Sequence, residues 1–398
     1  MDLTAQIYQY VVAHYLPPRL QKRPLQALAK GAALVSAAFT SERRTLPIHY
    51  FNRPDYRSGY LLYFVAVNLP KILHCLSMSH IAARLLRQPS LRVLDLGCGP
   101  GTGALAMAAW WQGHHQQGTL TILGVDQNRK ILEDARNLMA RCFPQVSHTT
   151  VPRTITANTL PSLRGGPFDV ILCANLLNEI PSERERLGLV STLVQQHLTD
   201  HGISLILEPA LRQPTRALMV LHDQLLAPHT TPHTDPRSPR SPRSLARIPH
   251  ILAPCLHQAA CPMLRPSRRD WCHAYLDWER PPLIAKLDHL IGNRKEYLKF
   301  SYLILSNRGS ETSRLNQHLP QYRVVSAPLR SKGKTELLLC PATAAPEALT
   351  RLTRLDRDRS SANAEFDRVL RGDIVETMAT TRLTADTDFR IIQSFRVL

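Results

Sequence analysis

The segment VLDLGCGPGTG, residues 93–103, limits the possible folds of this chain more than any other feature. An aliphatic run typical of a buried strand leads into glycines at positions 97, 99, 101 and 103, and an Ala-rich helical stretch follows. Glycine lets the backbone turn sharply and approach a ligand closely, and the first turn of a helix has free N–H groups. The order of strand, glycine loop and helix therefore predicts a ligand-binding α/β unit.

Strands and helices continue to alternate after this loop. Apolar, strand-like runs recur at residues 119–128, 168–180 and 202–210, and helical stretches separate them. Such alternation predicts a parallel sheet in a doubly wound, Rossmann-like α/β fold. We assign residues 86–227 to this core and residues 1–85, where Ala and Leu recur at helical spacing, to an N-terminal helical region.

The rest of the chain divides into four parts by composition. Residues 228–249 are rich in Pro, Arg and Ser, which predicts a mobile basic linker. Residues 250–296 form a cysteine-rich insertion. Residues 297–340 contain apolar runs that predict the last strands of the core sheet. Residues 341–398 are polar and predict a C-terminal extension that is partly disordered.

Two carboxylates indicate which cofactor suits the glycine loop. Asp95 lies two residues before Gly97, where an anion suits the cationic amino-acid part of S-adenosylmethionine better than a pyrophosphate. Asp126 ends the next strand, where a carboxylate can accept hydrogen bonds from both ribose hydroxyls. The alternatives are a dinucleotide-binding loop or a purely structural turn.

With these residues the chain from about 90 to 210 resembles the class I S-adenosylmethionine-dependent methyltransferases. The resemblance implies a methyltransferase fold for the core and S-adenosylmethionine as its cofactor. The positions that match the binding motifs of that family are Asp95, Gly97, Gly99, Gly101 and Asp126.

A further candidate follows the third strand-like run, because ligands of open α/β sheets bind at the carboxyl ends of strands. There Asn175 would line the cofactor pocket or hold the methyl acceptor, and Asn175 and Glu179 are our candidates for catalysis. Alternatively, Asn175 and Asn178 only satisfy backbone groups of the loop. The sequence has no Asn-Pro-Pro-Tyr or Asp-Pro-Pro-Tyr motif of amino-group methylation, so we assign no catalytic base.

Three of the eight cysteines lie close together in a polar, Arg-rich stretch: Cys255, Cys261 and Cys272. Four thiolates complete a four-iron four-sulfur cluster or a tetrahedral zinc site, and Cys340, at the end of an apolar run, is the fourth candidate. The wide spacing favours a cluster, because zinc ligands usually come in closer pairs. A zinc site with three cysteines and His257 or His273 is the main alternative, and unrelated buried cysteines are another.

The cysteines belong to a longer pattern, in which ILAPCLHQAACPM, DWCHAYLDWERPPL, YLKFSYLILS and APLRSKGKTELLLC follow LDLGCGPGTG and LLNEI. Over residues 45–340 this pattern resembles the small-ribosomal-subunit family called Rsm twenty-two or methyltransferase-like seventeen. The resemblance implies association with the maturing small ribosomal subunit and its rRNA. It also implies a [4Fe-4S] cluster, whose ligands would be Cys255, Cys261, Cys272 and Cys340.

One residue departs from the family pattern, which is commonly Cys-Pro-His, because Leu256 replaces the proline. The thiols are intact, so the departure concerns only the local shape of the loop. A cluster with these ligands would fasten the insertion to the core sheet, on which we place Cys340. We expect such a cluster to be structural and to position an RNA-binding surface.

The charge balance favours a polyanionic partner. The formal net charge is +18, with 49 Lys and Arg against 31 Asp and Glu, and RNA is the partner that such a field suits best. A solvated basic surface without a partner is the alternative. The residues that we expect to contact RNA are Arg265, Arg268, Arg269, Trp271, Trp278, Arg280, Arg294, Lys295, Arg330, Lys332 and Lys334. Trp271 and Trp278 could instead exclude water from the cluster.

The first residues resemble neither a signal peptide nor a transit peptide, and no apolar run suggests a membrane span. We therefore expect a cytoplasmic, monomeric protein of bacterial type. Our first hypothesis is a methyltransferase that acts on small-subunit rRNA during ribosome assembly. The second is a non-catalytic assembly factor that binds RNA and keeps the cofactor and the cluster as structural elements.

Overall fold

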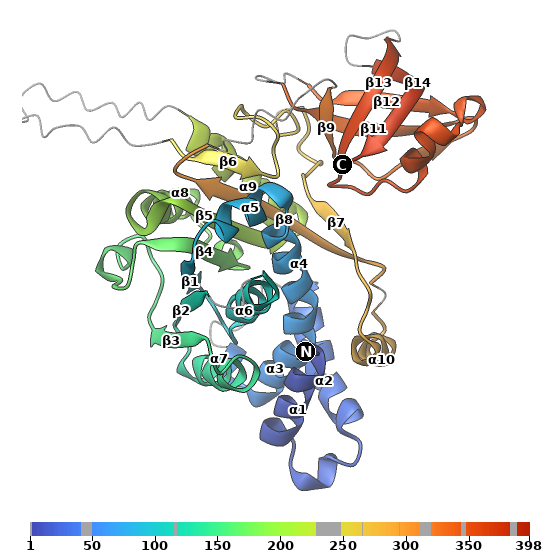
Figure 1. The fold of residues 1–398 in the computed structure, drawn as a ribbon. Coiled ribbons are helices and arrows are strands. Elements are labelled where there is room, and N and C mark those ends of the chain that lie inside the picture. Colours follow the sequence, from blue (N-terminus) through green and yellow to red (C-terminus); the bar gives the residue numbers. More distant parts are fainter. Residues whose placement is uncertain are drawn as a thin grey trace, which may run out of the picture. The chain divides into compact units, whose positions relative to one another are not determined.

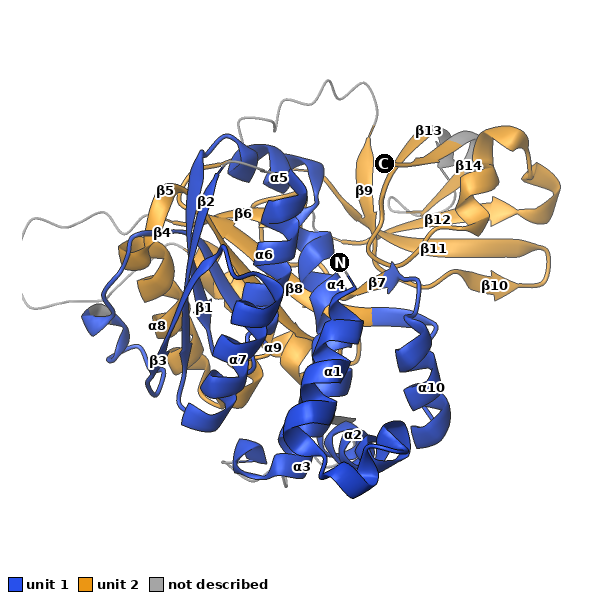
Figure 2. Cartoon of the chain, turned by 60° about the horizontal axis from the view of Figure 1, so that its bottom comes forward, with its two compact units in different colours: residues 1–174, 276–298 blue, residues 175–275, 299–398 orange. Residues whose placement is uncertain are grey.

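The structure is a computed structural model that describes residues 2–40, 50–114, 118–227, 248–264, 266–293, 295–309, 320–343, 348–382 and 388–398. The chain forms two compact units, residues 1–174 with 276–298 and residues 175–275 with 299–398 (Figure 2). The Pro/Arg/Ser tract that we expected to be a linker lies outside the described residues, apart from its last two positions.

The first unit contains a parallel sheet in the order β3-β2-β1-β4 (Figure 1). Its strands are β1 (Ser90–Leu96), β2 (Thr119–Asp126), β3 (Ser147–Pro152) and β4 (Phe168–Ala174). The side chains of Val93 and Leu94 are fully buried although they point to opposite faces of β1, which is typical of a parallel sheet covered on both faces. Helices α6 (Thr102–His114) and α7 (Arg129–Cys142) alternate with these strands along the chain. The predicted Rossmann-like α/β fold is confirmed.

The N-terminal region is helical, as predicted. Its helices are α1 (Leu3–Tyr15), α2 (Pro24–Thr40), the 3-10 turn η3 (Tyr50–Asn52), α3 (Pro54–Gly59), the π-helical turn η4 (Tyr60–Val65), α4 (Ala66–Leu76) and α5 (Ser79–Leu86). Helix α10 (Pro282–Ile291) belongs to the same unit, because Tyr63 donates a hydrogen bond to Asp288 and Asn293 Nδ2 lies 3.0 Å from the Tyr63 hydroxyl. The expected insertion of residues 250–296 is therefore divided, since its last third packs against the N-terminal helices.

Residues Pro54–Leu76 form a continuous helical stretch of 23 residues that is long and apolar enough to cross a membrane. The mean hydropathy of its most apolar window is 1.3, and 61% of that window is buried inside the protein. A buried core helix meets the same criteria, so this stretch is weak support for a membrane span. Our sequence analysis did not anticipate it.

The second unit begins with the remaining α/β elements. It contains the helices α8 (Glu183–Thr192) and α9 (Arg212–Leu226), the strands β5 (Leu198–Pro209) and β6 (His250–Ala253), and most of β8 (Tyr297–Ser306), while β7 (Ala274–Asp277) spans the boundary between the units. Strand β8 is antiparallel to β5, with Glu208 opposite Ser301, and β6 is antiparallel to β8. The run at residues 297–306 is therefore a late strand beside β5, as predicted.

The same unit ends in a second sheet that sequence analysis did not predict. Its strands are β9 (Gln321–Val324), β10 (Leu329–Ser331), β11 (Lys334–Pro341), β12 (Thr350–Leu355), β13 (Ile374–Arg382) and β14 (Asp388–Val397). Strand β9 pairs with both β11 and β13, which closes five strands into a barrel. Only β12 and β14 are parallel, a connectivity that corresponds to an OB-fold. Residues 321–340 are thus not part of the core sheet, and residues 348–382 and 388–398 are not an extension but most of this barrel.

The barrel surrounds a small apolar core that includes Val324, Leu337, Leu339 and Phe366. One charged side chain enters it. Arg354 is only 1% exposed, lies 4.7 Å from the centroid of the Phe366 ring and donates hydrogen bonds to the Asn363 carbonyl at 3.1 Å and to Asp367 at 2.5 Å. Arg354 therefore links β12 to the turn that closes one end of the barrel.

Replacing Arg354 with Met keeps most of the side-chain volume but removes both donated hydrogen bonds. We expect the free energy of unfolding to fall by about 2–3 kcal/mol, because hydrogen bonds of charged groups contribute about 1.5–3 kcal/mol and the apolar packing partly remains. The exposed Arg357→Met is the matched control, with a change below about 0.5 kcal/mol. Urea unfolding measures both, and equal midpoints for the two variants would contradict the role given to Arg354.

Candidate functional site

The glycine loop between β1 and α6 has the backbone conformation that its sequence predicts. Gly97, Gly99 and Gly101 have φ angles of 68°, 50° and 82°, which residues other than glycine rarely adopt. The amides of Gly97 and Cys98 donate to the Val125 carbonyl at 2.8 and 3.1 Å, so the loop is fastened to the end of β2.

Asp95 lies beneath this loop instead of at its surface. Its side chain is 1% exposed, and its carboxylate accepts the Ala104 amide of α6 at 2.9 Å. Burial raises the pKa of Asp95 to about 7. Asp95 therefore supports the start of α6, and contact with a ligand amino group remains a prediction.

Gly103 leaves the space that Asp95 occupies. A Cβ atom at position 103 would lie 2.6 Å from Asp95 Oδ1, which is closer than two atoms can pack. We expect Gly103→Ala to displace the carboxylate and lower the free energy of unfolding by about 1–3 kcal/mol, the usual cost of overpacking. Gly113→Ala in the same helix meets no atom within 4 Å and should be neutral or stabilising. Thermal unfolding that ranks the two variants equally would show that the Gly103 contact is unimportant.

Asp126, the last residue of β2, accepts two backbone amides with its carboxylate. Its Oδ2 accepts the Gly99 amide at 3.0 Å and its Oδ1 accepts the Asn128 amide at 2.9 Å. An ionised carboxylate has about four acceptor sites, so two remain for hydroxyl donors. The Thr102 hydroxyl, in the same loop, is buried and has no hydrogen-bond partner among the described residues. These groups fit the nucleoside part of S-adenosylmethionine.

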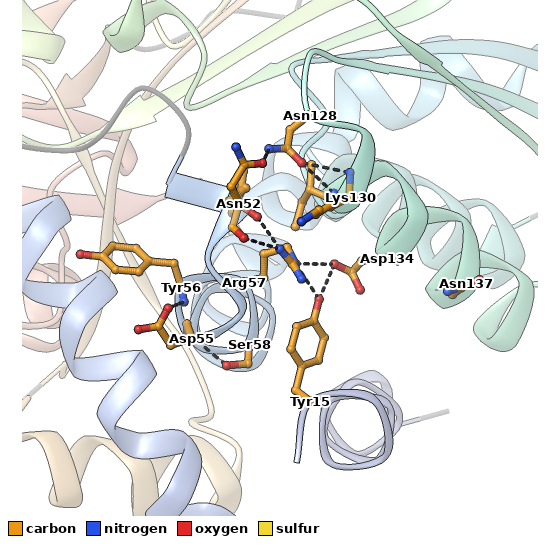
Figure 3. A network of polar contacts seen from close by, with 12 residues as sticks. Tyr15, Asn52, Asp55, Tyr56, Arg57, Ser58, Asn128, Lys130, Asp134 and Asn137 are labelled. Atoms are coloured by element: carbon orange, nitrogen blue, oxygen red, sulfur yellow. Dashed lines mark hydrogen bonds and ion pairs between the residues drawn. The ribbon is translucent and has the colours of Figure 1, made fainter. Parts of the chain in front are cut away.

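Residues of the N-terminal region border the same site, and sequence analysis missed them. Asn128, which caps α7, donates from its side chain to Asn52 Oδ1 at 3.1 Å (Figure 3). The ring of Phe51 lies 3.9 Å from the position that a Cβ of Gly99 would take. These contacts join distant segments and have no sequence motif that could have revealed them.

The candidates for catalysis lie in the second unit. Asn175 has a φ of 59°, an unusual backbone conformation for a residue other than glycine, and its amide donates to the Leu207 carbonyl at 2.7 Å. Glu179 ends a 3-10 turn and is exposed. Glu208 is 1% exposed and its Oε1 accepts the Leu177 amide at 2.8 Å. The loop after β4 is thus held in a strained shape, which is common at functional sites.

The four cysteines of the predicted cluster all lie in the second unit, where the chain folds Cys340 back toward the other three. Cys261 packs in an apolar group with Met219, and Cys272 and Cys340 pack against this group. Burial raises the pKa of Cys255 well above the usual range, and the neighbouring thiols of Cys272, Cys340 and Cys261 raise it further. Four sulfurs from distant segments therefore share one neighbourhood, although Cys340 is on β11 of the barrel and not on the core sheet as we expected.

The histidines beside these cysteines are buried and neutral. His257 Nε2 lies 3.5 Å from Cys340 Sγ, and burial lowers the pKa of His257 to about 4. His273 Nδ1 lies 3.1 Å from the Trp271 carbonyl oxygen, and burial lowers the pKa of His273 to about 3. Among the described residues, no three Cys, His, Asp or Glu side chains form a group that could hold a single metal ion.

Helix α9 and the barrel both hold the cysteine segment in place. Arg216 of α9 donates to three carbonyl oxygens of the segment, those of Leu264, Ser267 and Asp270. The Asp223 carboxylate accepts the Cys261 amide at 2.8 Å. These anchors fix the backbone around Cys261 and Cys272 without any ligand.

Two arginines, the buried Arg323 and the half-buried Arg371, lie beside the thiols. Arg323 is 3% exposed, donates to the Pro254 carbonyl and the Tyr302 hydroxyl, and has a buried Nε without a partner among the described residues. Arg371 donates to the Trp271 carbonyl at 2.6 Å and has a buried, unpartnered Nε as well. The Asp373 carboxylate interacts electrostatically with Arg323, but it already accepts a hydrogen bond from the Leu370 amide. Buried cations need a counter-charge, so this neighbourhood suits an anionic centre.

The residues that we expected to contact RNA are in different settings. Arg268 and Arg269 are exposed, and Trp271 packs against the cysteine group while its Nε1 donates to the Ala210 carbonyl. Lys332 and Lys334 flank the turn of the β10–β11 hairpin. Three other candidates lie in the first unit, where the indole nitrogen of Trp278 is buried and where Arg280 pairs with Asp288 and donates to the Lys295 carbonyl. Arg265 and Arg294 lie outside the described residues.

The family model described as mitochondrial small ribosomal subunit Rsm22 matches residues 73–361. The human ribosome assembly protein METTL17, mitochondrial, is 24% identical over 250 residues, which are 61% of this chain and 51% of METTL17. The chain thus spans about half the length of this curated relative.

Similar solved structures are S-adenosylmethionine-dependent methyltransferases. A class I enzyme from Listeria monocytogenes is 14% identical, with a TM-score of 0.37 over 78% of this chain and 89% of that one. An enzyme from Clostridium acetobutylicum is 17% identical, with a TM-score of 0.27 over 37% of this chain and 50% of that one. The Rsm22 family model, by contrast, covers well over half of the sequence, and the chain therefore belongs to the Rsm22 family.

Proposed function

We propose that this protein binds S-adenosylmethionine and a [4Fe-4S] cluster and acts on small-subunit rRNA during ribosome assembly. The observation that carries the proposal is the convergence of Cys255, Cys261, Cys272 and Cys340 beside the buried Arg323. Membership of the Rsm22 family and the printed role of METTL17 as a ribosome assembly protein support the cellular context.

The glycine loop and Asp126 would hold the cofactor. Asp126 offers its free acceptor sites to the ribose hydroxyls, and the positive φ angles of the glycines let the backbone approach the ligand closely. When bound, S-adenosylmethionine supplies an electrophilic methyl group. Asp95 contributes indirectly by fixing the first turn of α6.

A cluster suits the cysteine neighbourhood better than zinc does. Zinc ligands usually come in close pairs along the chain, whereas Cys255, Cys261 and Cys272 are widely spaced and a cluster takes its four thiolates at separate corners. A cluster with four thiolate ligands is an anion, and the buried Arg323 and the half-buried Arg371 would balance its charge. The nearby His257 and His273 would be neutral neighbours of the ligands instead of ligands.

An RNA partner fits both the charge and the fold. The formal net charge of +18 favours a polyanion, and OB-fold barrels often bind oligonucleotides. In the second unit, Arg268 and Arg269 are exposed on a loop whose backbone Arg216 holds in place. We propose this loop as a contact for the phosphates of the small-subunit rRNA.

The second hypothesis is a non-catalytic assembly factor. It is favoured by the loop after β4, where Asn175 bonds the backbone, Glu179 is exposed and Glu208 accepts a backbone amide. None of these groups has the setting of a general base. The cofactor would then serve to stabilise the protein.

Mapping of rRNA methylation decides between the two hypotheses. We expect a strain that lacks the gene to lose methylation at one or a few small-subunit nucleotides, and Asp126→Ala to reproduce that loss, because the variant cannot bind the methyl donor. Glu133→Ala, which removes an exposed carboxylate of α7, is the matched control and should restore the wild-type pattern. If methylation is unchanged while unfinished small subunits accumulate, the protein is an assembly factor.

A further inference from the structure

We propose that the N-terminal segment η3 forms the outer wall of the nucleoside site, and that Arg57 positions this wall. The inference rests on the proposed binding of S-adenosylmethionine. It assigns part of the cofactor site to the N-terminal region, which lies outside the methyltransferase motifs that match this sequence. All residues concerned belong to the first unit.

The wall touches both groups that hold the Asp126 carboxylate. The amide of Gly99 bonds Asp126 Oδ2, and the Phe51 ring lies 3.9 Å from the position that a Gly99 Cβ would take. The amide of Asn128 bonds Asp126 Oδ1, and the Asn128 side chain bonds Asn52 at 3.1 Å. Phe51 and Asn52 therefore contact Gly99 and Asn128, the residues whose amides orient the proposed ribose-binding carboxylate.

The aromatic ring of the wall is buried and packs against two other rings. Phe51 is 8% exposed, its ring centroid lies 4.2 Å from that of Tyr50, and it meets Tyr60 edge-on at 5.1 Å. An apolar ring in this place would shield the site from water. Burial of this kind strengthens hydrogen bonds from a ligand to the carboxylate.

Arg57 holds the backbone of the wall from the other side (Figure 3). Its NH1 donates to the carbonyls of Phe51 at 2.7 Å and Asn52 at 3.2 Å. Its Nε donates to the Tyr15 hydroxyl at 3.1 Å and lies 3.7 Å from Asp134 Oδ2. One guanidinium thus ties the wall to α1 and α7.

The anchor of Arg57 is itself buried and accepts hydrogen bonds from two tyrosines. Asp134 accepts hydrogen bonds from the hydroxyls of Tyr10 at 2.8 Å and Tyr15 at 2.6 Å. The side chains of Arg57 and Asp134 are only 12% and 8% exposed, so the pair is shielded from solvent. Such a network favours one arrangement of the groups that it joins. Its role at the site is therefore positional, and Arg57 need not touch the cofactor.

Titration of S-adenosylhomocysteine into the full-length protein by calorimetry tests this inference. Arg57→Met keeps the aliphatic stem but removes the donors, and we expect the Kd to rise at least tenfold. Arg53→Met is the matched control, because the Arg53 guanidinium is exposed and contacts Asp55 and the Tyr56 ring; its Kd should stay within twofold of the wild-type value. Amide hydrogen exchange without ligand should speed up at Gly99 and Asn128 in Arg57→Met but not in Arg53→Met.

A milder variant keeps the test informative if Arg57→Met folds poorly by circular dichroism. Asn52→Ala removes one exposed hydrogen bond to Asn128, and we expect a rise in Kd of about threefold. Wild-type affinity in the folded Arg57→Met would overturn this inference but leave the proposed cofactor site intact. If Arg57→Met does not fold, wild-type affinity in Asn52→Ala has the same meaning. Unchanged hydrogen exchange at Gly99 and Asn128 would also overturn the inference. A wild-type protein that binds no S-adenosylhomocysteine would overturn the proposed cofactor site and this inference with it.

Discussion

We expect the replacement of Cys340 with Ser to remove the iron and the acid-labile sulfide of the proposed cluster from protein purified without oxygen. The wild-type protein is expected to contain about four iron atoms per chain, as a [4Fe-4S] cluster does, and the variant less than one. A serine hydroxyl is a poor ligand for iron at neutral pH, and the remaining three thiols lie in the separate segment 255–272. Chemical analysis of iron and sulfide, together with visible absorption, measures this effect.

The same substitution should destabilise the second unit. Ligand groups that converge only in the folded chain couple the free energy of metal binding to the free energy of folding. Without the cluster, Arg323 would be a buried cation with no strong counter-charge. We therefore expect faster hydrogen exchange in the segment around Cys261 and a lower midpoint of urea unfolding.

A control variant separates cluster loss from the general effect of removing a buried thiol. Cys142 on α7 is also buried but lies in the first unit, and Cys142→Ser should keep a full complement of iron. Anaerobic wild-type protein with one zinc atom per chain, and neither iron nor sulfide, would replace the cluster with a zinc site. Protein without any metal would exclude both.

The α/β core could be predicted from sequence because its signals are local. The strand before Gly97 and the helix after Gly103 are adjacent in the chain, and the glycines report the backbone shape directly. The barrel could not be predicted in this way. Strand β12 has Arg354 on its inner face and Arg351 on its outer face, so it lacks the alternation of apolar and polar residues by which a strand is recognised.

The assignment of Cys340 shows a related limit. The run LLLC predicts a buried strand, but a pattern with period two does not say which sheet the strand joins. In the structure β11 pairs with β9 and β12, and its outward-facing Leu338 and Cys340 pack against the cysteine segment. The partners of that strand are set by tertiary contacts that appear only in the folded chain.

The proposed cofactor site also has one part that the sequence predicts and one part that it does not. Asp126 follows its strand at the position where such a carboxylate is expected, and the structure adds its two backbone donors. Arg57 carries no such signal, because it acts through the carbonyl groups of Phe51 and Asn52. A different side chain can hold the same backbone atoms in a related protein. No short sequence motif therefore marks a residue with this role.

Asp126→Ala is expected to weaken binding of S-adenosylhomocysteine by at least a hundredfold. Two hydroxyl donors on one buried carboxylate contribute about 1.5–3 kcal/mol each, and a factor of ten corresponds to about 1.4 kcal/mol. The loss of the bonds to Gly99 and Asn128 also loosens the glycine loop. Glu133→Ala, an exposed carboxylate on α7, is the control and should bind as the wild type does. Calorimetric titration of the ligand into each variant gives the Kd values.

The pH dependence of the same binding distinguishes a carboxylate that contacts the ligand from one that only shapes the loop. Burial raises the pKa of Asp126, so the charged form that accepts hydroxyl donors is lost at a higher pH than for an ordinary aspartate. The affinity of the wild type should therefore begin to fall, as the pH decreases, at a higher pH than an ordinary aspartate would give. Asp126→Asn, which cannot ionise but keeps one acceptor oxygen, should bind weakly at every pH and with a flatter profile. Parallel profiles for the two proteins would mean that another group, such as Asp95, determines the pH dependence of binding. The proposed contact between Asp126 and the ribose would then be wrong.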